Sequence, residues 1–147
     1  MREFKGRVIA KGTTTAEAVV SHEGLNTLAS FQKALQFGDK TATCGDQNNK
    51  DLFGKQMAGK ALCLPQTIGS TTGGLVLYCA CAMERQPACM LFSKSIDSLA
   101  AAGSILASVW LDGIKMPVID NLCDEFLEYV QNGMTITVLE DGTVVVE

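Results

Sequence analysis

The sequence has a single histidine, and its twelve lysines and arginines are scattered singly. With His22 as the only histidine, a Ser-His-Asp hydrolase triad is not expected. The lack of a basic stripe, together with a net charge of -4, disfavours nucleic-acid binding. The longest apolar stretches, such as 73–83, fall well short of the about 20 residues that cross a bilayer, and the N-terminus lacks a signal-type apolar segment. We therefore expect a cytoplasmic protein that binds neither nucleic acid nor membrane.

The cysteines lack the spacing of a metal site. No C-x-x-C occurs, and most of the six cysteines lie inside apolar runs such as 62–64 and 78–82. In a reducing compartment such residues act as small buried hydrophobes. The sequence thus predicts no metal site in this chain and no disulfide. The cysteines are Cys44, Cys63, Cys79, Cys81, Cys89 and Cys123.

The length of 147 residues, with 47% apolar and 19% charged residues, fits one compact domain spanning 1–147. Hydrophobic periodicity and turn residues predict its elements. Strands are expected at 4–10, 14–20, 61–64, 88–92, 105–110 and 116–119, and a closing β-hairpin at 135–139 and 143–146. Helices are expected within 121–130 and at 95–102, the latter capped by Ser95 and ended by Gly103. The order predicts an α/β fold.

Three segments are less defined by their residues. Residues 75–85 are apolar at nearly every position, which favours a buried helix over a second buried strand because Ser and Thr precede them. Residues 25–35 fit a short helix or an irregular loop. The polar segment 37–54 reads as a long surface loop, a class that is often functional or disordered.

The segment 69–74, Gly-Ser-Thr-Thr-Gly-Gly, is the best candidate for a site. Its glycines allow backbone N–H groups to converge, and a following helix would direct its positive dipole end there. We expect Ser70 to be the reactive group, with Gly69, Thr71, Thr72 and Gly73 contacting substrate. The alternative is a capping turn without function. The segment is neither a P-loop nor a G-x-S-x-G elbow.

Other polar groups are weaker candidates. His22 sits in a polar turn and is expected to be solvated. Asp39, Asp46 and Asp51 lie in the long loop, where they could contact a substrate or partner or simply keep the loop soluble. The chain thus carries one candidate reactive group and lacks the residues to act alone.

From Asp51 onward the sequence resembles the small subunit of aconitase X, a branch of the aconitase superfamily. The residues 51–65, DLFGKQMAGKALCLP, lead into 69–74 as the family's loop, strand and catalytic turn do. Matches at Gly6-Arg7-Val8-Ile9, Pro87-Ala88, Ala102-Gly103 and Pro117-Val118 extend the likeness over most of the chain.

This resemblance implies a single β/β/α swivelling domain like the fourth domain of aconitase. It also implies a hydro-lyase in which Ser70 takes a proton alpha to a carboxylate while hydroxide departs. A large partner subunit would complete the site and hold the family's iron-sulfur cluster.

The sequence departs from the family at two places. The usual Asp-x-x-His-Pro-Leu motif is replaced by 46–52, DQNNKDL, and the Ser-Phe-x-Gly-Gly segment is reduced to 29–33, ASFQK. With no basic phosphate clamp either, cis-3-hydroxy-L-proline or another small hydroxy acid is the expected substrate. The alternatives are a phosphomevalonate dehydratase small subunit, a non-catalytic binding or scaffold domain that kept the swivel fold, and an anion-binding domain using 69–74.

Overall fold

The computed structural model describes residues 1–69 and 72–147. The strands are β1 (Arg2–Lys5), β2 (Arg7–Ala10), β3 (Thr14–Val20), β4 (Leu25–Asn26), β5 (Ala61–Leu64), β6 (Thr67–Ile68), β7 (Cys89–Phe92), β8 (Val118–Asp120), β9 (Thr135–Val138) and β10 (Thr143–Val146). The helices are α1 (Thr27–Phe37), α2 (Gly73–Ala82), α3 (Ser98–Trp110) and α4 (Asp124–Tyr129). None of these helices is long and apolar enough to cross a membrane.

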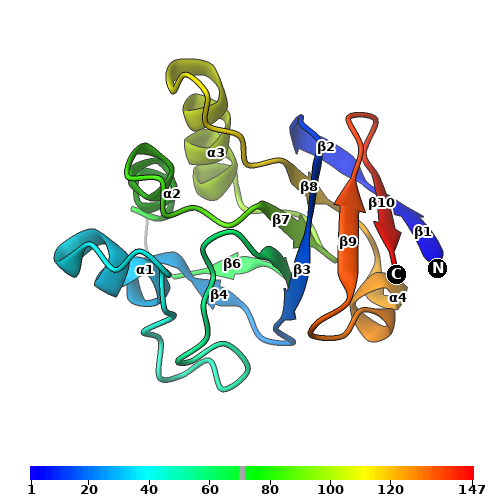
Figure 1. Cartoon of the computed structure of the whole chain (residues 1–147), viewed down its shortest axis with the longest axis horizontal. Coiled ribbons are helices and arrows are strands. Elements are labelled where there is room, and N and C mark those ends of the chain that lie inside the picture. Colours follow the sequence, from blue (N-terminus) through cyan, green and yellow to red (C-terminus); the bar gives the residue numbers. More distant parts are fainter. Residues whose placement is uncertain (70–71) are drawn as a thin grey trace.

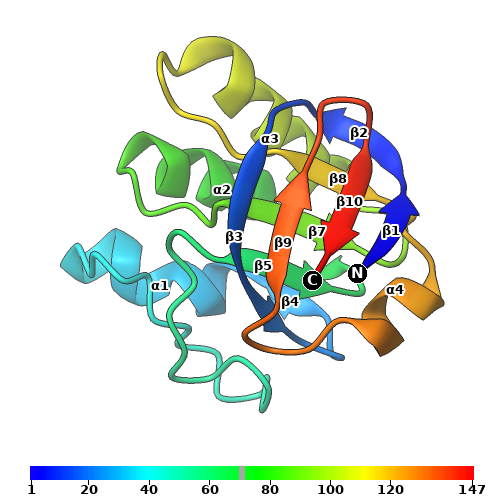
Figure 2. The same cartoon turned by 45° about the vertical axis from the view of Figure 1, so that its right-hand side comes forward.

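Eight strands form one strongly curled sheet in the order β1-β10-β9-β3-β5-β7-β8-β2. The strands β3, β5, β7 and β8 run parallel, and the others join antiparallel. The helices α1, α2 and α3 lie on one side of the parallel part (Figure 1). On the other side β9 and β10 lie across β5 and β7, as the turned view in Figure 2 shows. The result is three layers, sheet on sheet on helices.

Two hydrophobic cores separate these layers because side chains alternate along each central strand. On β5, Leu62 and Leu64 face the core under the helices, while Ala61 and Cys63 face the core between the two parts of the sheet. The second core also takes apolar side chains from β9, β10 and α4, including Phe126. Parallel strands that are buried on both faces have continuous apolar sequences. This is the pattern of β5, with the sequence ALCL, and of β7, with the sequence CMLF.

Most predicted elements are confirmed, including the α/β class, the closing hairpin, α2 as a helix rather than a strand, and a helix in 25–35. The first strand is divided at Gly6, where an added Cβ would lie 2.3 Å from the carbonyl oxygen of Asp120. The two-residue parallel pair β4–β6 was not predicted. The segment 38–60 is irregular, which agrees with the loop predicted at 37–54 except that Phe37 ends α1. The loop does not lie wholly on the surface, because Leu52 within it is fully buried, as is Met57 just beyond it.

The prediction for 95–110 was wrong. Instead of a helix at 95–102 followed by a strand at 105–110, one helix runs from Ser98 to Trp110. Asp97 rather than Ser95 caps it, and Gly103 lies in its interior. The β-branched residues near its end favour a strand locally. Packing of the helix against α2 outweighs that preference, and Gly103 serves this packing rather than a helix end.

Candidate active site

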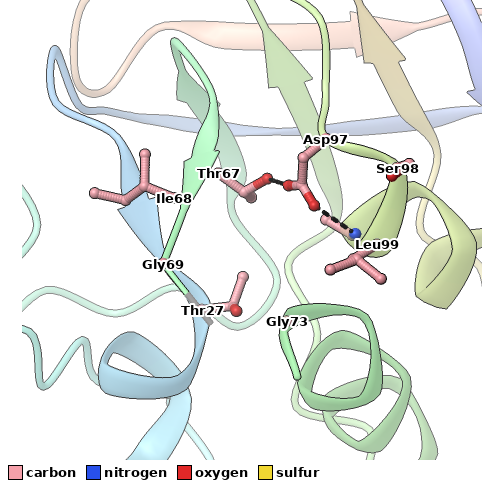
Figure 3. Close-up of a pocket in the computed structure, with 9 residues that line it drawn as sticks. Thr27, Thr67, Ile68, Gly69, Gly73, Asp97, Ser98 and Leu99 are labelled. Carbon is pink, nitrogen blue, oxygen red and sulfur yellow. Dashed lines mark hydrogen bonds between the residues drawn. The ribbon is translucent and has the colours of Figure 1, made fainter. Parts of the chain in front are cut away.

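The N-termini of three helices meet around a hollow of about 250 Å³ (Figure 3). The helices α1, α2 and α3 follow β4, β6 and β7, so the hollow lies beyond the carboxyl ends of these strands. In open α/β sheets this edge is where ligands bind. The lining residues are Thr27, Thr67, Ile68, Gly69, Gly73, Asp97, Ser98, Leu99 and Ala100.

Asp97 connects two sides of the hollow. One carboxylate oxygen accepts a hydrogen bond from the Ala100 N–H at 3.0 Å and caps α3. The other oxygen accepts a hydrogen bond from the hydroxyl of Thr67 on β6 (Figure 3). The aspartate thereby fixes the start of α3 against the strand that leads into α2, and both of its oxygens are engaged within the protein.

The opposite side is formed by the β4–α1 junction. Asn26 caps α1 by accepting a hydrogen bond from the Ala29 N–H at 3.1 Å. The backbone of Gly69 and Gly73 approaches this junction so closely that neither position has free room for a side chain. An added Cβ at Gly69, where φ is +97°, would lie 3.0 Å from the Asn26 amide nitrogen, and one at Gly73 would lie 2.9 Å from the Thr27 hydroxyl.

The hollow is suited to an anion by its backbone rather than by charged side chains. None of the described lining residues is Lys, Arg or His. Asn26 and the acidic Asp97 each accept one N–H group at the starts of α1 and α3. Each helix N-terminus still carries roughly half a positive charge, so three together favour a carboxylate or phosphate. An anion held this way faces donors that are already oriented, which is the arrangement that stabilises charge developing during a reaction.

Of the predicted site residues, Gly69 and Gly73 line the hollow, and Thr72 is the N-cap of α2 directly beside it. The predicted Ser70 and Thr71 lie outside the described residues. Thr67 and Asp97 were missed by the sequence analysis. The sequence contains a signal for Asp97: the pair Asp97-Ser98 precedes an alanine-rich segment, which is typical of a helix N-cap.

The weaker candidates lie elsewhere. His22 is exposed, and its backbone N–H donates to Asp51 at 2.8 Å. Asp39 accepts hydrogen bonds from the N–H of Thr43 and the hydroxyl of Thr41, and these lower its pKa to about 2. These carboxylates stabilise turns, and neither lines the hollow.

The altered motif at 46–52 has a structural role. Asn49, in that motif, is buried and donates to the Ser21 hydroxyl at 3.1 Å, while its carbonyl accepts from the Leu52 N–H. Asp46 is buried too and accepts from the Asn48 N–H at 3.0 Å. The segment is therefore fastened to the end of β3 without a histidine.

The cysteines do not form a binding site for an iron-sulfur cluster. Within 1–69 and 72–147, no group of three or more His, Cys, Asp and Glu side chains could hold a metal ion. Burial raises the pKa of Cys81 to about 11 and that of Cys89 to about 12. Burial, and to a lesser extent Cys89, also raises the pKa of Cys63. Burial therefore favours the protonated form of each of these thiols.

The layers and the hollow define a class of protein, a β/β/α domain with three helix N-termini around one hollow. The chain belongs to the aconitase X swivel domain family, whose model matches residues 3–146. It is 30% identical to the phosphomevalonate dehydratase small subunit of Methanocella arvoryzae, over 96% of this chain and 94% of that protein. The corresponding subunit of Methanosarcina mazei is 27% identical over 92% and 84%.

A solved structure supports the same assignment. The crystal structure of Thermococcus kodakaraensis aconitase X in its holo form superposes with a TM-score of 0.81 and 25% identity, covering all of this chain and 99% of that one. The predicted fold of a swivelling domain is thus confirmed, and the predicted resemblance to the aconitase X small subunit is confirmed with it.

Proposed function

We propose that this chain is the small subunit of a hydro-lyase of the aconitase X type, which removes water from a small hydroxy acid together with a large subunit. The observation that supports this best is the hollow between three helix N-termini, because it adjoins the segment that contains Ser70 in the sequence. Membership of the aconitase X swivel domain family and the relatives named as small subunits support the same proposal.

In the proposed reaction Ser70 acts as the base. The base is the serine alkoxide: the C–H bond alpha to the substrate carboxylate breaks, and its proton goes to the alkoxide oxygen, which becomes a hydroxyl. The electron pair forms a carbon–carbon double bond, and hydroxide leaves from the neighbouring carbon. A serine hydroxyl is too weak an acid to be deprotonated at neutral pH unaided, so the alkoxide needs electrostatic support from its surroundings. We propose that the backbone N–H groups of 69–73 and the helix N-termini supply it while holding the carboxylate, with Gly69, Thr71, Thr72 and Gly73 as the binding residues.

The large subunit completes this proposal. The described residues do not fit an iron-sulfur cluster, so we assign the cluster of the aconitase-like enzyme to the partner. The hollow is also open at this chain's surface, and a site that stabilises charge works best when water is excluded. Accordingly, the isolated chain should be inactive.

Two substrates are candidates, and different observations favour them. The names of the curated relatives favour a phosphorylated mevalonate. The lack of Lys, Arg and His among the described lining residues favours a substrate whose only anionic group is a carboxylate, such as cis-3-hydroxy-L-proline. A substrate with a phosphate in addition to its carboxylate would need basic side chains from the large subunit for the second anionic group.

The test is to co-express the chain with the aconitase X large subunit of the same genome and to supply each acid in turn. Loss of one water from the substrate, followed by mass spectrometry, reports the reaction. Ser70→Ala should lower kcat by roughly 10²- to 10⁴-fold without changing the melting temperature. Ser108→Ala, an exposed serine at the far end of α3, is the matched control.

Full turnover by Ser70→Ala would exclude the serine as the base. A complex that assembles but dehydrates neither acid would favour the non-catalytic scaffold instead. Binding of phosphate to the isolated chain, measured by titration, would favour the anion-binding domain.

A further inference from the structure

The outer face of α2 and α3 is apolar although it is exposed. Neither Gly73–Ala82 nor Ser98–Trp110 contains an Asp, Glu, Lys or Arg. A helix that packs on one side of a sheet normally turns charged residues to water. Depletion of charge with exposure of aromatic and aliphatic side chains is typical of the centre of a protein interface. The exposed apolar side chains on these helices are Leu75, Leu99, Ile105, Leu106, Val109 and Trp110.

A groove of about 350 Å³ runs between the two helices on this face. Leu75 and Leu106 line it, with Tyr78 and Trp110 at one end. The two rings meet edge to face with centroids 6.2 Å apart. Trp110 is 65% exposed and Leu75 is 64% exposed, so most of their apolar surface faces water. Large aromatic side chains beside a groove are the residues that most often dominate binding energy in protein interfaces.

The position of the groove indicates what covers it. Leu99 lines both this groove and the hollow between the helix N-termini, so the two adjoin each other. Ile68, 48% exposed, adds an apolar side chain on another side of the hollow. A protein that closes the hollow from above therefore meets the apolar groove at the same time. An amphipathic membrane contact is disfavoured, because these helices offer no basic residue to lipid headgroups.

We propose that the α2–α3 face, defined as Leu75, Tyr78, Leu99, Leu106 and Trp110, docks against an apolar surface of the large subunit. This proposal rests on the proposed function, because the large subunit is the partner that the proposed function requires to complete the site. Because the face carries no charge, its affinity should change little between about 0.05 and 0.5 M salt.

The test purifies the two subunits separately and measures their binding to each other by titration calorimetry. Trp110→Glu and Leu106→Glu place a charge on an exposed helical position, so each should fold normally, with an unchanged circular dichroism spectrum. Each should weaken binding at least about thirty-fold. Phe37→Glu is the matched control, because Phe37 is 80% exposed at the end of α1, away from α3 (Figure 1). It should bind like the wild type.

A second measurement follows the docking face directly. The chain has one tryptophan, so labelling this subunit alone with 5-fluorotryptophan gives a single fluorine resonance for Trp110. Addition of the unlabelled large subunit should shift that resonance and reduce its response to a soluble paramagnetic agent. An unshifted resonance in a formed complex would overturn the inference, as would a homodimer of the isolated chain that Trp110→Glu dissociates.

The two proposals fail separately. A complex that depends on Trp110 and Leu106 but dehydrates neither acid contradicts the proposed function and leaves the docking face intact. An active complex that binds both glutamate variants as tightly as the wild type contradicts the docking face and leaves the function intact.

Discussion

Gly74 and Gly103 face each other where α2 crosses α3, and their backbones are nearly in contact. A Cβ added to Gly103 would lie 1.9 Å from the carbonyl oxygen of Gly74, and one added to Gly74 would lie 2.1 Å from that of Leu99. Backbone atoms cannot move aside as a flexible side chain can. The pair therefore sets how closely the two helices approach, and with it the separation of two of the N-termini at the hollow.

Gly103→Ala should therefore separate the helices. The cost of overpacking is about 1–3 kcal/mol or more, against which alanine regains about 1 kcal/mol of helix propensity. We expect a net loss in the free energy of unfolding, measured by urea denaturation, and reduced dehydratase activity in the complex. Ala102→Ser, at an exposed position of the same helix, should change stability little. A Gly103→Ala variant as stable as the wild type would contradict the close crossing.

Asp97→Ala removes a helix cap and the hydrogen bond to Thr67 at once. Loss of such a cap costs about 1 kcal/mol, and the start of α3 should also loosen at the hollow. The free energy of unfolding in urea should fall by about 1–2 kcal/mol. The kcat/KM of the complex should also fall under conditions in which the variant is fully folded, because the start of α3 at the hollow is less well fixed. Asp97→Asn keeps an oxygen for the Ala100 N–H and should retain most of the stability. Equal losses in both variants would contradict the capping role.

Arg7 and Asp120 form an ion pair whose acid is fully buried. Arg7 donates to the two carboxylate oxygens at 2.9 and 2.6 Å, and this contact raises the pKa of the arginine. One oxygen also accepts from the Ile96 N–H at 2.9 Å, next to the cap of α3. We expect Arg7→Ala to lower the free energy of unfolding in urea denaturation, because it removes two hydrogen bonds from the buried Asp120 carboxylate.

The control for this pair is Lys5→Ala. Lys5 and Asp141 form an exposed pair at 3.7 Å, and such pairs contribute about 0–1 kcal/mol. If the two alanine variants lost the same stability, burial of Asp120 would not be the source of the effect.

Stability should fall at alkaline pH because of the buried thiols. The pKa of Cys89 rises from 9.0 to about 12 on folding, and burial raises that of Cys63 as well. Below pH 9 both states are protonated. Between about pH 9 and 12 the unfolded Cys89 thiol loses a proton that the folded thiol keeps, so the free energy of unfolding decreases by about 1.4 kcal/mol per pH unit for this group. The raised pKa of Cys63 acts in the same direction above pH 9.

The measurement is urea denaturation from pH 7 to 11, compared with the Cys63→Ala/Cys89→Ala double variant. That variant should be less stable at pH 7, because it leaves small cavities, but its stability should decline less steeply above pH 9. Parallel pH profiles for the two proteins would contradict the assignment.

The sequence-based prediction was reliable where local and tertiary preferences agree. The hairpin around 140–142 follows from a Gly turn between alternating apolar residues, and the structure confirms it. It was unreliable at 105–110, where Ile105 and Val109 favour a strand but the helix packs against α2. For the candidate site, two glycines of the predicted segment, Gly69 and Gly73, line the hollow, while Thr67 and Asp97 became visible only once β6 and α3 were placed together.

The sequence by itself determined the α/β class, the closing hairpin and the resemblance to aconitase X, because these depend on residue type and spacing along the chain. Only the tertiary structure decided that three helix N-termini meet at one hollow and that an uncharged groove adjoins it. Both features depend on the crossing of α2 and α3 at Gly74 and Gly103, residues far apart in sequence whose contact no local pattern encodes.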